Sequence, residues 1–249
     1  MSGNREGPDV KKTLERLAAA LSFLTILPVP GKREVNRSSA FFPLAGWIIG
    51  GTLFGIITAA ASLPVLARAF LVVAAWELAS RGLHVDGLAD TADAFIASGS
   101  KDRVLRILDD SHTGAFGVLA IGLLLLGKFA FLSSLSFNTG RVAVLCACVV
   151  GRFGLCLFAG LFGAARDEGL GSAIINSTGW LEVAVAAVLA FAPLGAFFGI
   201  RALYASCGLV LGLLLAMYSR WKIGGLTGDI LGACMELSEL AVLFTFLFL

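Results

Sequence analysis

The sequence predicts an all-α protein, a polytopic bundle of about six to eight transmembrane helices with a polar cytoplasmic face. Of the 249 residues, 58% are hydrophobic and 14% are charged, whereas soluble domains carry about a quarter charged residues. Mean hydropathy is +0.90. Several apolar stretches reach the ~20 residues that a helix needs to cross a bilayer core. We therefore expect residues 1–249 to form a single integral membrane domain.

The elements follow in chain order. Residues 1–40 are expected to form an N-terminal cytoplasmic or interfacial segment, whose polar first ten residues do not resemble a signal peptide. The apolar stretch 14–27 is too short to span the membrane and predicts an interfacial helix. The predicted spans are 41–63, 64–83, 115–136, 140–165, 180–200, 202–219 and 230–249.

The loops between these spans alternate between two faces. Residues 1–40, 81–114, 166–179 and 220–229 share one face, which holds 14 of the 19 Lys and Arg residues. The positive-inside tendency makes that face cytoplasmic. We expect a multi-pass protein of the bacterial cytoplasmic (inner) membrane with its active face in the cytoplasm. Because a transporter usually binds its solute near the midplane, the gathering of polar residues at one face favours an enzyme.

Composition argues against several other classes of site. The five cysteines lie in apolar stretches without CxxC spacing or a neighbouring histidine, so zinc binding and a disulfide framework are both disfavoured. We interpret them as small buried residues. A net charge of +2 gives no indication of a nucleic-acid partner, and none is expected.

The segment 84–93 (HVDGLADTAD) carries the strongest chemical signal. On a helix, Asp86, Asp90 and Asp93 project from one face within roughly 60° of arc. Their mutual repulsion and hard oxygen ligands suit Mg²⁺. A solvated helix face is the alternative, but no Lys or Arg at i±4 neutralises the stripe. His84 lies roughly 160° around the helix from Asp86, which suits either packing or substrate contact.

The segment 101–117 predicts an amphipathic surface helix followed by a span that begins near Gly114 and Gly117. Free N–H groups at such a helix start would make a phosphate cradle. Asp110 could complete the metal site. Ser111 is a candidate phosphate ligand or an ordinary N-cap.

Lys128 and Arg152 lie inside apolar spans. Burying a charge there costs at least about 2.5 kcal/mol, so these side chains should face a polar cavity or the bundle interior. We favour phosphate or pyrophosphate binding. The alternative is a structural ion pair that involves Glu77.

Two further segments supply candidates. In 220–236, glycines precede a helix that Thr227 could cap, and Asp229 and Glu236 then share a face that could form a second wall of a divalent site. A cap and a packed glycine face are the alternative. Arg166 belongs to a charged, glycine-bearing loop at 165–171.

In this order and spacing, the segments resemble the cobalamin synthase (adenosylcobinamide-GDP ribazoletransferase) family. The resemblance covers nearly the whole chain and rests on 23–30 (FLTILPVP), Phe42-Pro43, 84–93 (HVDGLADTAD), 110–117 (DSHTGAFG), Lys128, Arg152, 165–171 (ARDEGLG), 224–229 (GGLTGD) and Glu236. Two departures are Asp109 and His112, where the family has a basic residue and an arginine. Neutral histidine binds anions less strongly than arginine does.

The resemblance implies a Mg²⁺-dependent transferase that joins adenosylcobinamide-GDP to α-ribazole or its 5′-phosphate, releases GMP and completes adenosylcobalamin. The expected partners are these small molecules and membrane lipid, and a homo-oligomer is left open. A membrane CDP-alcohol phosphotransferase and a polytopic transporter are the alternatives. The implied site comprises the metal ligands Asp86, Asp90, Asp93 and Asp110, the catalytic residues Asp86, Asp90 and Asp229, the substrate ligands His84, Ser111, Lys128, Arg152, Arg166 and Thr227, and Glu236 as a secondary candidate.

Overall fold

A computed structural model describes residues 10–30, 35–97 and 99–249. In these residues every regular element is helical, and the one extended pairing is an isolated bridge between Ala164 and Leu226. The helices are α1 Val10–Leu24, η1 Ser38–Phe41, α2 Phe42–Ala59, α3 Val65–Ala79, α4 Leu83–Ile96, α5 Lys101–Leu108, α6 Ala115–Ser134, α7 Phe137–Phe162, α8 Leu170–Ser177, α9 Trp180–Phe198, α10 Ile200–Ser206, α11 Leu209–Ile223, α12 Gly228–Thr245 and η2 Phe246–Phe248. The predicted all-α fold class is confirmed.

Six helical stretches within the described residues are long and apolar enough to cross a membrane, which lies inside the predicted range of six to eight. They are Ser38–Ala59, Ala115–Ser134, Phe137–Phe162, Trp180–Phe198, Ile200–Ile223 and Gly228–Phe248. These six correspond in order to predicted spans. The structure therefore has the apolar helices that a multi-pass membrane protein requires.

The remaining predicted span, 64–83, is interrupted. Its helix, α3, has 15 residues, too few to cross a ~30 Å core at full thickness. Arg81 and Gly82 then take the left-handed backbone conformation, with φ of 58° and 66°, and the chain continues as α4. Arg81 also donates to the carbonyl oxygen of Ser22 at 2.9 Å, which ties this break to α1. The segment 81–114 is thus mostly the two helices α4 and α5 rather than a loop.

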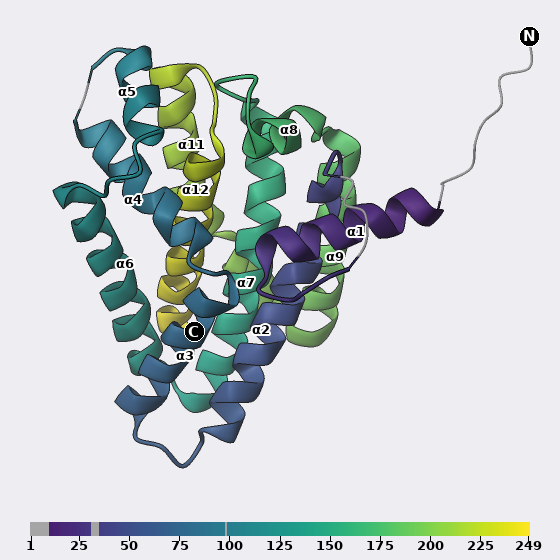
Figure 1. The fold of residues 1–249 in the computed structure, drawn as a ribbon. Coiled ribbons are helices and arrows are strands. Elements are labelled where there is room, and N and C mark those ends of the chain that lie inside the picture. The colour runs from purple at the N-terminus through teal and green to yellow at the C-terminus, as the bar shows by residue number, and fades with distance from the viewer. Residues whose placement is uncertain (1–9, 31–34, 98) are drawn as a thin grey trace, which may run out of the picture.

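The short N-terminal helix α1 lies across the bundle, whereas most of the long helices run along it (Figure 1). Ala19, Ala20 and Leu24 are buried against the rest of the protein, while Val10 and Leu14 are exposed. A one-sided helix of this kind fits the predicted interfacial element at 14–27. Its position in a membrane stays a prediction, and residues 1–9 of the polar N-terminus lie outside the described part.

Helix α7 forms the centre of the bundle. In its 18-residue apolar stretch 94% of the residues are buried, and α2, α9, α11 and α12 all pack on it. Helix α4 packs against α6 and α12 instead. Helices α5 and α8 and the turn before α12 lie at the same end of the bundle (Figure 1), which we call the α5–α8 end. The acidic segment on α4 is thereby held beside the start of α12.

Candidate active site

Helices α4 and α12 approach each other through glycines. A Cβ atom on Gly87 would lie 2.7 Å from the carbonyl oxygen of Asp229, and one on Gly232 would lie 3.2 Å from the Cα atom of His84. Only glycine allows backbones to come this close. The packed glycine face that the sequence left as an alternative for 220–236 is present at Gly232, and the contact at Gly87 brings Asp229 beside the acidic face of α4.

Five carboxyl groups share one region, and we call Asp86, Asp90, Asp93, Asp110 and Asp229 the acidic group. Partial burial raises the pKa of Asp90 to about 6, and the negative charges of the other four add to the rise. The helical spacing predicted for the first three is confirmed, because all three lie on α4. The α5–α6 connection supplies Asp110 and α12 supplies Asp229, so three segments contribute negative charge to one place.

Asp93 binds the backbone at the start of helix α6. Its Oδ2 atom accepts from Gly114 N at 2.7 Å and its Oδ1 atom from Gly117 N at 3.0 Å. A Cβ atom on either glycine would lie 2.5 Å from this carboxylate. The N–H groups predicted to cradle a phosphate are therefore occupied, and that interpretation is wrong. An anionic side chain has taken the place at the helix N-terminus that a phosphate would favour.

The α5–α6 connection is exposed. Asp110 accepts from His112 N at 3.1 Å and bonds its Nδ1 at 2.6 Å, and these bonds lower the pKa of Asp110. Ser111 is exposed and is not the N-cap of α6, since Gly114 takes that position. The N-cap alternative for Ser111 is wrong, and its contact with phosphate stays a prediction.

The acidic group suits Mg²⁺ in donor type and in charge. Carboxylate oxygens are hard ligands, and burial together with the charges of its four acidic neighbours raises the pKa of Asp90. Among the described residues, no three Asp, Glu, His or Cys side chains converge closely enough to hold an ion as they stand. Mg²⁺ often binds through one or two carboxylates together with substrate phosphates. The residues fit an ion of that kind.

The ammonium of Lys128 is not available to phosphate, contrary to our favoured interpretation, and Arg152 forms an ion pair. The ammonium of Lys128 donates to Glu77 at 2.8 Å, to Glu236 at 2.6 Å and to Glu239 at 2.9 Å, which uses all three of its N–H bonds. Arg152 donates to Glu239. Both basic side chains are fully buried. The ion pair with Glu77 that the sequence left open is present for Lys128, whereas Arg152 pairs with Glu239 and its Nε and Nη2 atoms have no partner among the described residues.

This cluster also removes Glu236 from the predicted metal wall, because its carboxylate is buried against Lys128. Glu239 was not among the residues predicted from the sequence. A signal existed: Glu239 follows Glu236 by three residues on the same helix and therefore shares its face. Two acids on one face of an apolar helix require buried cations.

Thr227 caps α12 as the alternative interpretation proposed. Its hydroxyl accepts from Ile230 N at 3.4 Å and the residue is fully buried. The hydroxyl is enclosed and lies 3.4 Å from an oxygen of Asp229, and its contact with substrate stays a prediction.

Arg166 stands at the edge of the acidic group. Its guanidinium pairs with Asp109, is about one third exposed, and lies close enough to Asp229 to act on its charge. The loop that carries it is fixed to the turn before α12, since Ala165 N donates to Leu226 O at 2.8 Å and Leu226 N donates to Gly163 O at 2.9 Å. Its role in phosphate binding stays a prediction.

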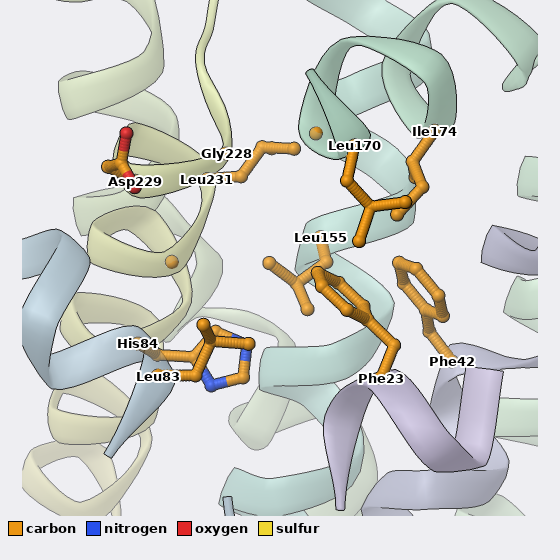
Figure 2. Close-up of a pocket in the computed structure, with 12 residues that line it drawn as sticks. Phe23, Phe42, Leu83, His84, Leu155, Leu170, Ile174, Gly228, Asp229 and Leu231 are labelled. Carbon is orange, nitrogen blue, oxygen red and sulfur yellow. The ribbon is translucent and has the colours of Figure 1, made fainter. Parts of the chain in front are cut away.

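A cavity of about 240 Å³ lies beside the acidic group. Figure 2 shows His84 and Asp229 on the side formed by α4 and α12, across the cavity from Phe23 and Leu170. Burial, with smaller contributions from Arg152 and Lys128, holds the pKa of His84 well below its usual value, so the imidazole is neutral at pH 7. The apolar residues that line this cavity, such as Phe23 and Leu170, could not be predicted from the sequence. They are of the same types as the other residues of the membrane helices.

The chain matches known proteins along most of its length. A family model described as cobalamin-5-phosphate synthase matches residues 16–247. Proteins named adenosylcobinamide-GDP ribazoletransferase are 35% identical over 238 residues in Acinetobacter baumannii (91% of this chain, 94% of the relative) and 38% identical over 236 residues in Pseudomonas syringae pv. syringae (91% and 96%). A Chlorobaculum parvum relative of the same name is 37% identical over 241 residues (93% and 94%). No solved structure matches the chain.

Proposed function

The chain belongs to the cobalamin-5-phosphate synthase family, and from this membership we infer that it is an adenosylcobinamide-GDP ribazoletransferase. It is a transferase of cobalamin biosynthesis that acts on two small molecules, adenosylcobinamide-GDP and α-ribazole or its 5′-phosphate. The relatives named above carry this activity in their names. They support neither the CDP-alcohol phosphotransferase nor the transporter that the sequence left as alternatives.

The reaction is a displacement at phosphorus. A ribose hydroxyl of the ribazole attacks the phosphorus atom bonded to cobinamide, a new P–O bond forms, and the bond from that phosphorus to the oxygen of GMP breaks. GMP leaves with the bonding electron pair. Asp229 accepts the hydroxyl proton, because it is half-buried and lies both in the acidic group and in the wall of the cavity.

The observation that supports this mechanism is the presence of four acidic side chains near enough to Asp90 for their charges to raise its pKa. Asp86, Asp90, Asp93 and Asp110 would hold Mg²⁺. When bound, the ion neutralises charge on the diphosphate and on the departing GMP. Arg166, at the edge of the group, would donate to a phosphate oxygen. The side chains of the protein position the two substrates and balance their charge.

We place the α5–α8 end in the cytoplasm of the bacterial inner membrane. The support is the distribution of Lys and Arg, 14 of 19 of which lie in the segments expected on that face. The nucleotide-activated substrate would then reach the acidic group from the cytoplasm.

The test uses the purified full chain with adenosylcobinamide-GDP, α-ribazole and Mg²⁺, and measures GMP and the complete corrinoid. Asp90→Asn should lower GMP release about 100-fold or more, as loss of a preorganised electrostatic contact does. Asp102→Asn is the matched control, since Asp102 is an exposed acid on α5 that does not contribute to the raised pKa of Asp90.

The two parts of the proposal fail separately. If the unaltered protein releases no GMP with both substrates present, the assigned reaction is wrong. If Asp90→Asn releases GMP at the normal rate at ordinary Mg²⁺ concentration, the reaction stands and the metal assignment is wrong.

A further inference from the structure

The cavity beside the acidic group has one apolar side and one polar side. Phe23 from α1, Phe42 from α2 and Leu155 from α7 line the apolar side. The polar side is formed by His84 and Asp229 (Figure 2). Six helices thus enclose a space that a ligand with one apolar and one polar part would fill.

The apolar side presents two neighbouring aromatic rings. The rings of Phe23 and Phe42 lie with their centroids 6.2 Å apart and their planes at 33°. Aromatic rings prefer to contact other rings in offset or tilted arrangements. Aliphatic side chains, including Leu155 and Ile174, complete this wall.

The polar side contains an atom without a partner. His84 is 3% exposed, and its Nδ1 atom makes no hydrogen bond to any described residue. Buried polar atoms are almost always hydrogen-bonded. Neutral imidazole carries one N–H, and in the tautomer that places it on Nδ1 His84 can donate to a ligand that presents a ring nitrogen.

Size and chemistry exclude two other occupants. Pockets for drug-sized ligands measure about 300–1,000 Å³, and this cavity, at about 240 Å³, is too small for a corrin macrocycle. A lipid acyl chain would fit the apolar wall but would leave His84 unpaired and would lie against the carboxyl group of Asp229. A fused-ring heteroaromatic base satisfies both sides.

We propose that this cavity binds the heteroaromatic base of α-ribazole, with the free ring nitrogen of the base hydrogen-bonded to His84 and the ribose directed toward Asp229. The proposal rests on the proposed function and names the place of one of its two substrates. It puts the attacking hydroxyl next to the acidic group, where the diphosphate of the other substrate would lie.

The first test fills the cavity from its rim. Leu170 lines it but is 50% exposed, so Leu170→Trp should fold normally while its ring blocks the space. The control is Leu181→Trp, since Leu181 is 65% exposed on the neighbouring helix α9 and is not part of the cavity. Binding of α-ribazole is measured by calorimetry without Mg²⁺ or corrinoid. We expect at least a tenfold higher Kd for Leu170→Trp and less than a twofold change for Leu181→Trp.

The second test changes the hydrogen bond. His84→Leu removes the N–H and should raise the Kd for α-ribazole and the KM for α-ribazole about tenfold, with the KM for adenosylcobinamide-GDP unchanged. His84→Asn keeps an N–H in a similar place and should restore part of the affinity. A merely structural histidine would affect both KM values or neither.

Each outcome decides the proposal. Unchanged α-ribazole binding in both Leu170→Trp and His84→Leu overturns it. So does a lipid that is extracted from the unaltered protein and lost from Leu170→Trp while α-ribazole affinity stays the same. Failure of the proposed function gives a different result, in which the unaltered protein binds α-ribazole but releases no GMP when both substrates and Mg²⁺ are present.

Discussion

The carboxylate of Asp93, on α4, accepts a hydrogen bond of 2.7 Å from the backbone N–H of Gly114 at the start of α6. The second oxygen accepts from Gly117 N. A side chain of one helix therefore caps the first turn of another, where the helix dipole favours negative charge. This contact fixes the acidic face of α4 relative to α6, and it depends on glycine at both donor positions.

Gly117→Ala should destabilise the protein because its Cβ atom would lie 2.5 Å from the carboxylate of Asp93. Loss of a helix cap costs about 1 kcal/mol, which corresponds to roughly 2–4 °C in Tm for a chain of this size. Gly122→Ala is the matched control, because an added Cβ there meets nothing within 4 Å on the same helix. Thermal unfolding in detergent compares the two variants, and an equal Tm for both would contradict the capping role.

Lys128→Met should be strongly destabilising, because it leaves the buried Glu236 and Glu239 and the partly exposed Glu77 without their shared cation. Breaking a buried ion pair from one side costs about 3–5 kcal/mol. The double variant Lys128→Met/Glu236→Gln removes one of the unpaired charges and should recover part of the loss. Yield of monodisperse protein and Tm are the measurements.

The same variants separate the structural role of Lys128 from the phosphate-binding role that the sequence favoured. If Lys128→Met keeps the Tm of the unaltered protein and raises only the KM for adenosylcobinamide-GDP, the ion-pair interpretation is wrong. The structure predicts the reverse, a loss of stability that Glu236→Gln partly offsets.

Activity should fall on the acid side with an apparent pKa near 6 when Mg²⁺ is limiting, because burial and its acidic neighbours raise the pKa of Asp90 to about 6. A protonated carboxyl group cannot hold the ion. Since Mg²⁺ and protons compete for the same oxygens, higher Mg²⁺ should shift the acid limb to lower pH. GMP release measured between pH 5 and 8 at several Mg²⁺ concentrations tests this. An apparent pKa of the acid limb that does not change with Mg²⁺ concentration would contradict it.

Asp90→Asn should raise the Tm slightly at pH 7 in the absence of Mg²⁺ while it abolishes activity. The pKa of Asp90 is higher in the folded protein than the 3.8 of an isolated aspartate. The folded state therefore binds more protons between about pH 4 and 6, and the contribution of this group to stability falls as pH rises through that window. The gain should disappear below about pH 3, where the group is protonated in both states.

Arg166→Gln should raise the KM for adenosylcobinamide-GDP with little change in Tm, because exposed ion pairs contribute only about 0–1 kcal/mol to stability. Asp109→Asn releases Arg166 from its partner and should lower that KM. Steady-state kinetics of both variants test the prediction, and a higher KM for Asp109→Asn would show that the pair itself, rather than a free guanidinium, is needed.

The apolar helices and the acidic face were predictable from the sequence. The free energy of placing a residue in lipid depends on its type and on the length of the run, so α2, α6, α7, α9 and α12 were visible as spans. Helical periodicity places Asp86, Asp90 and Asp93 on one face whatever surrounds them. The resemblance to the family followed from the order of such segments, and the matches along the chain support it.

The tertiary structure alone decided which groups meet. Lys128 and Arg152 could serve phosphate or glutamate equally well until α12 placed Glu239 between them. In the same way, the N–H groups at Gly114 and Gly117 were free until α4 brought Asp93 to them. Composition and periodicity act within one segment, whereas charge pairing, capping and the cavity beside His84 depend on contacts between distant segments, and the packing of the helices sets those contacts.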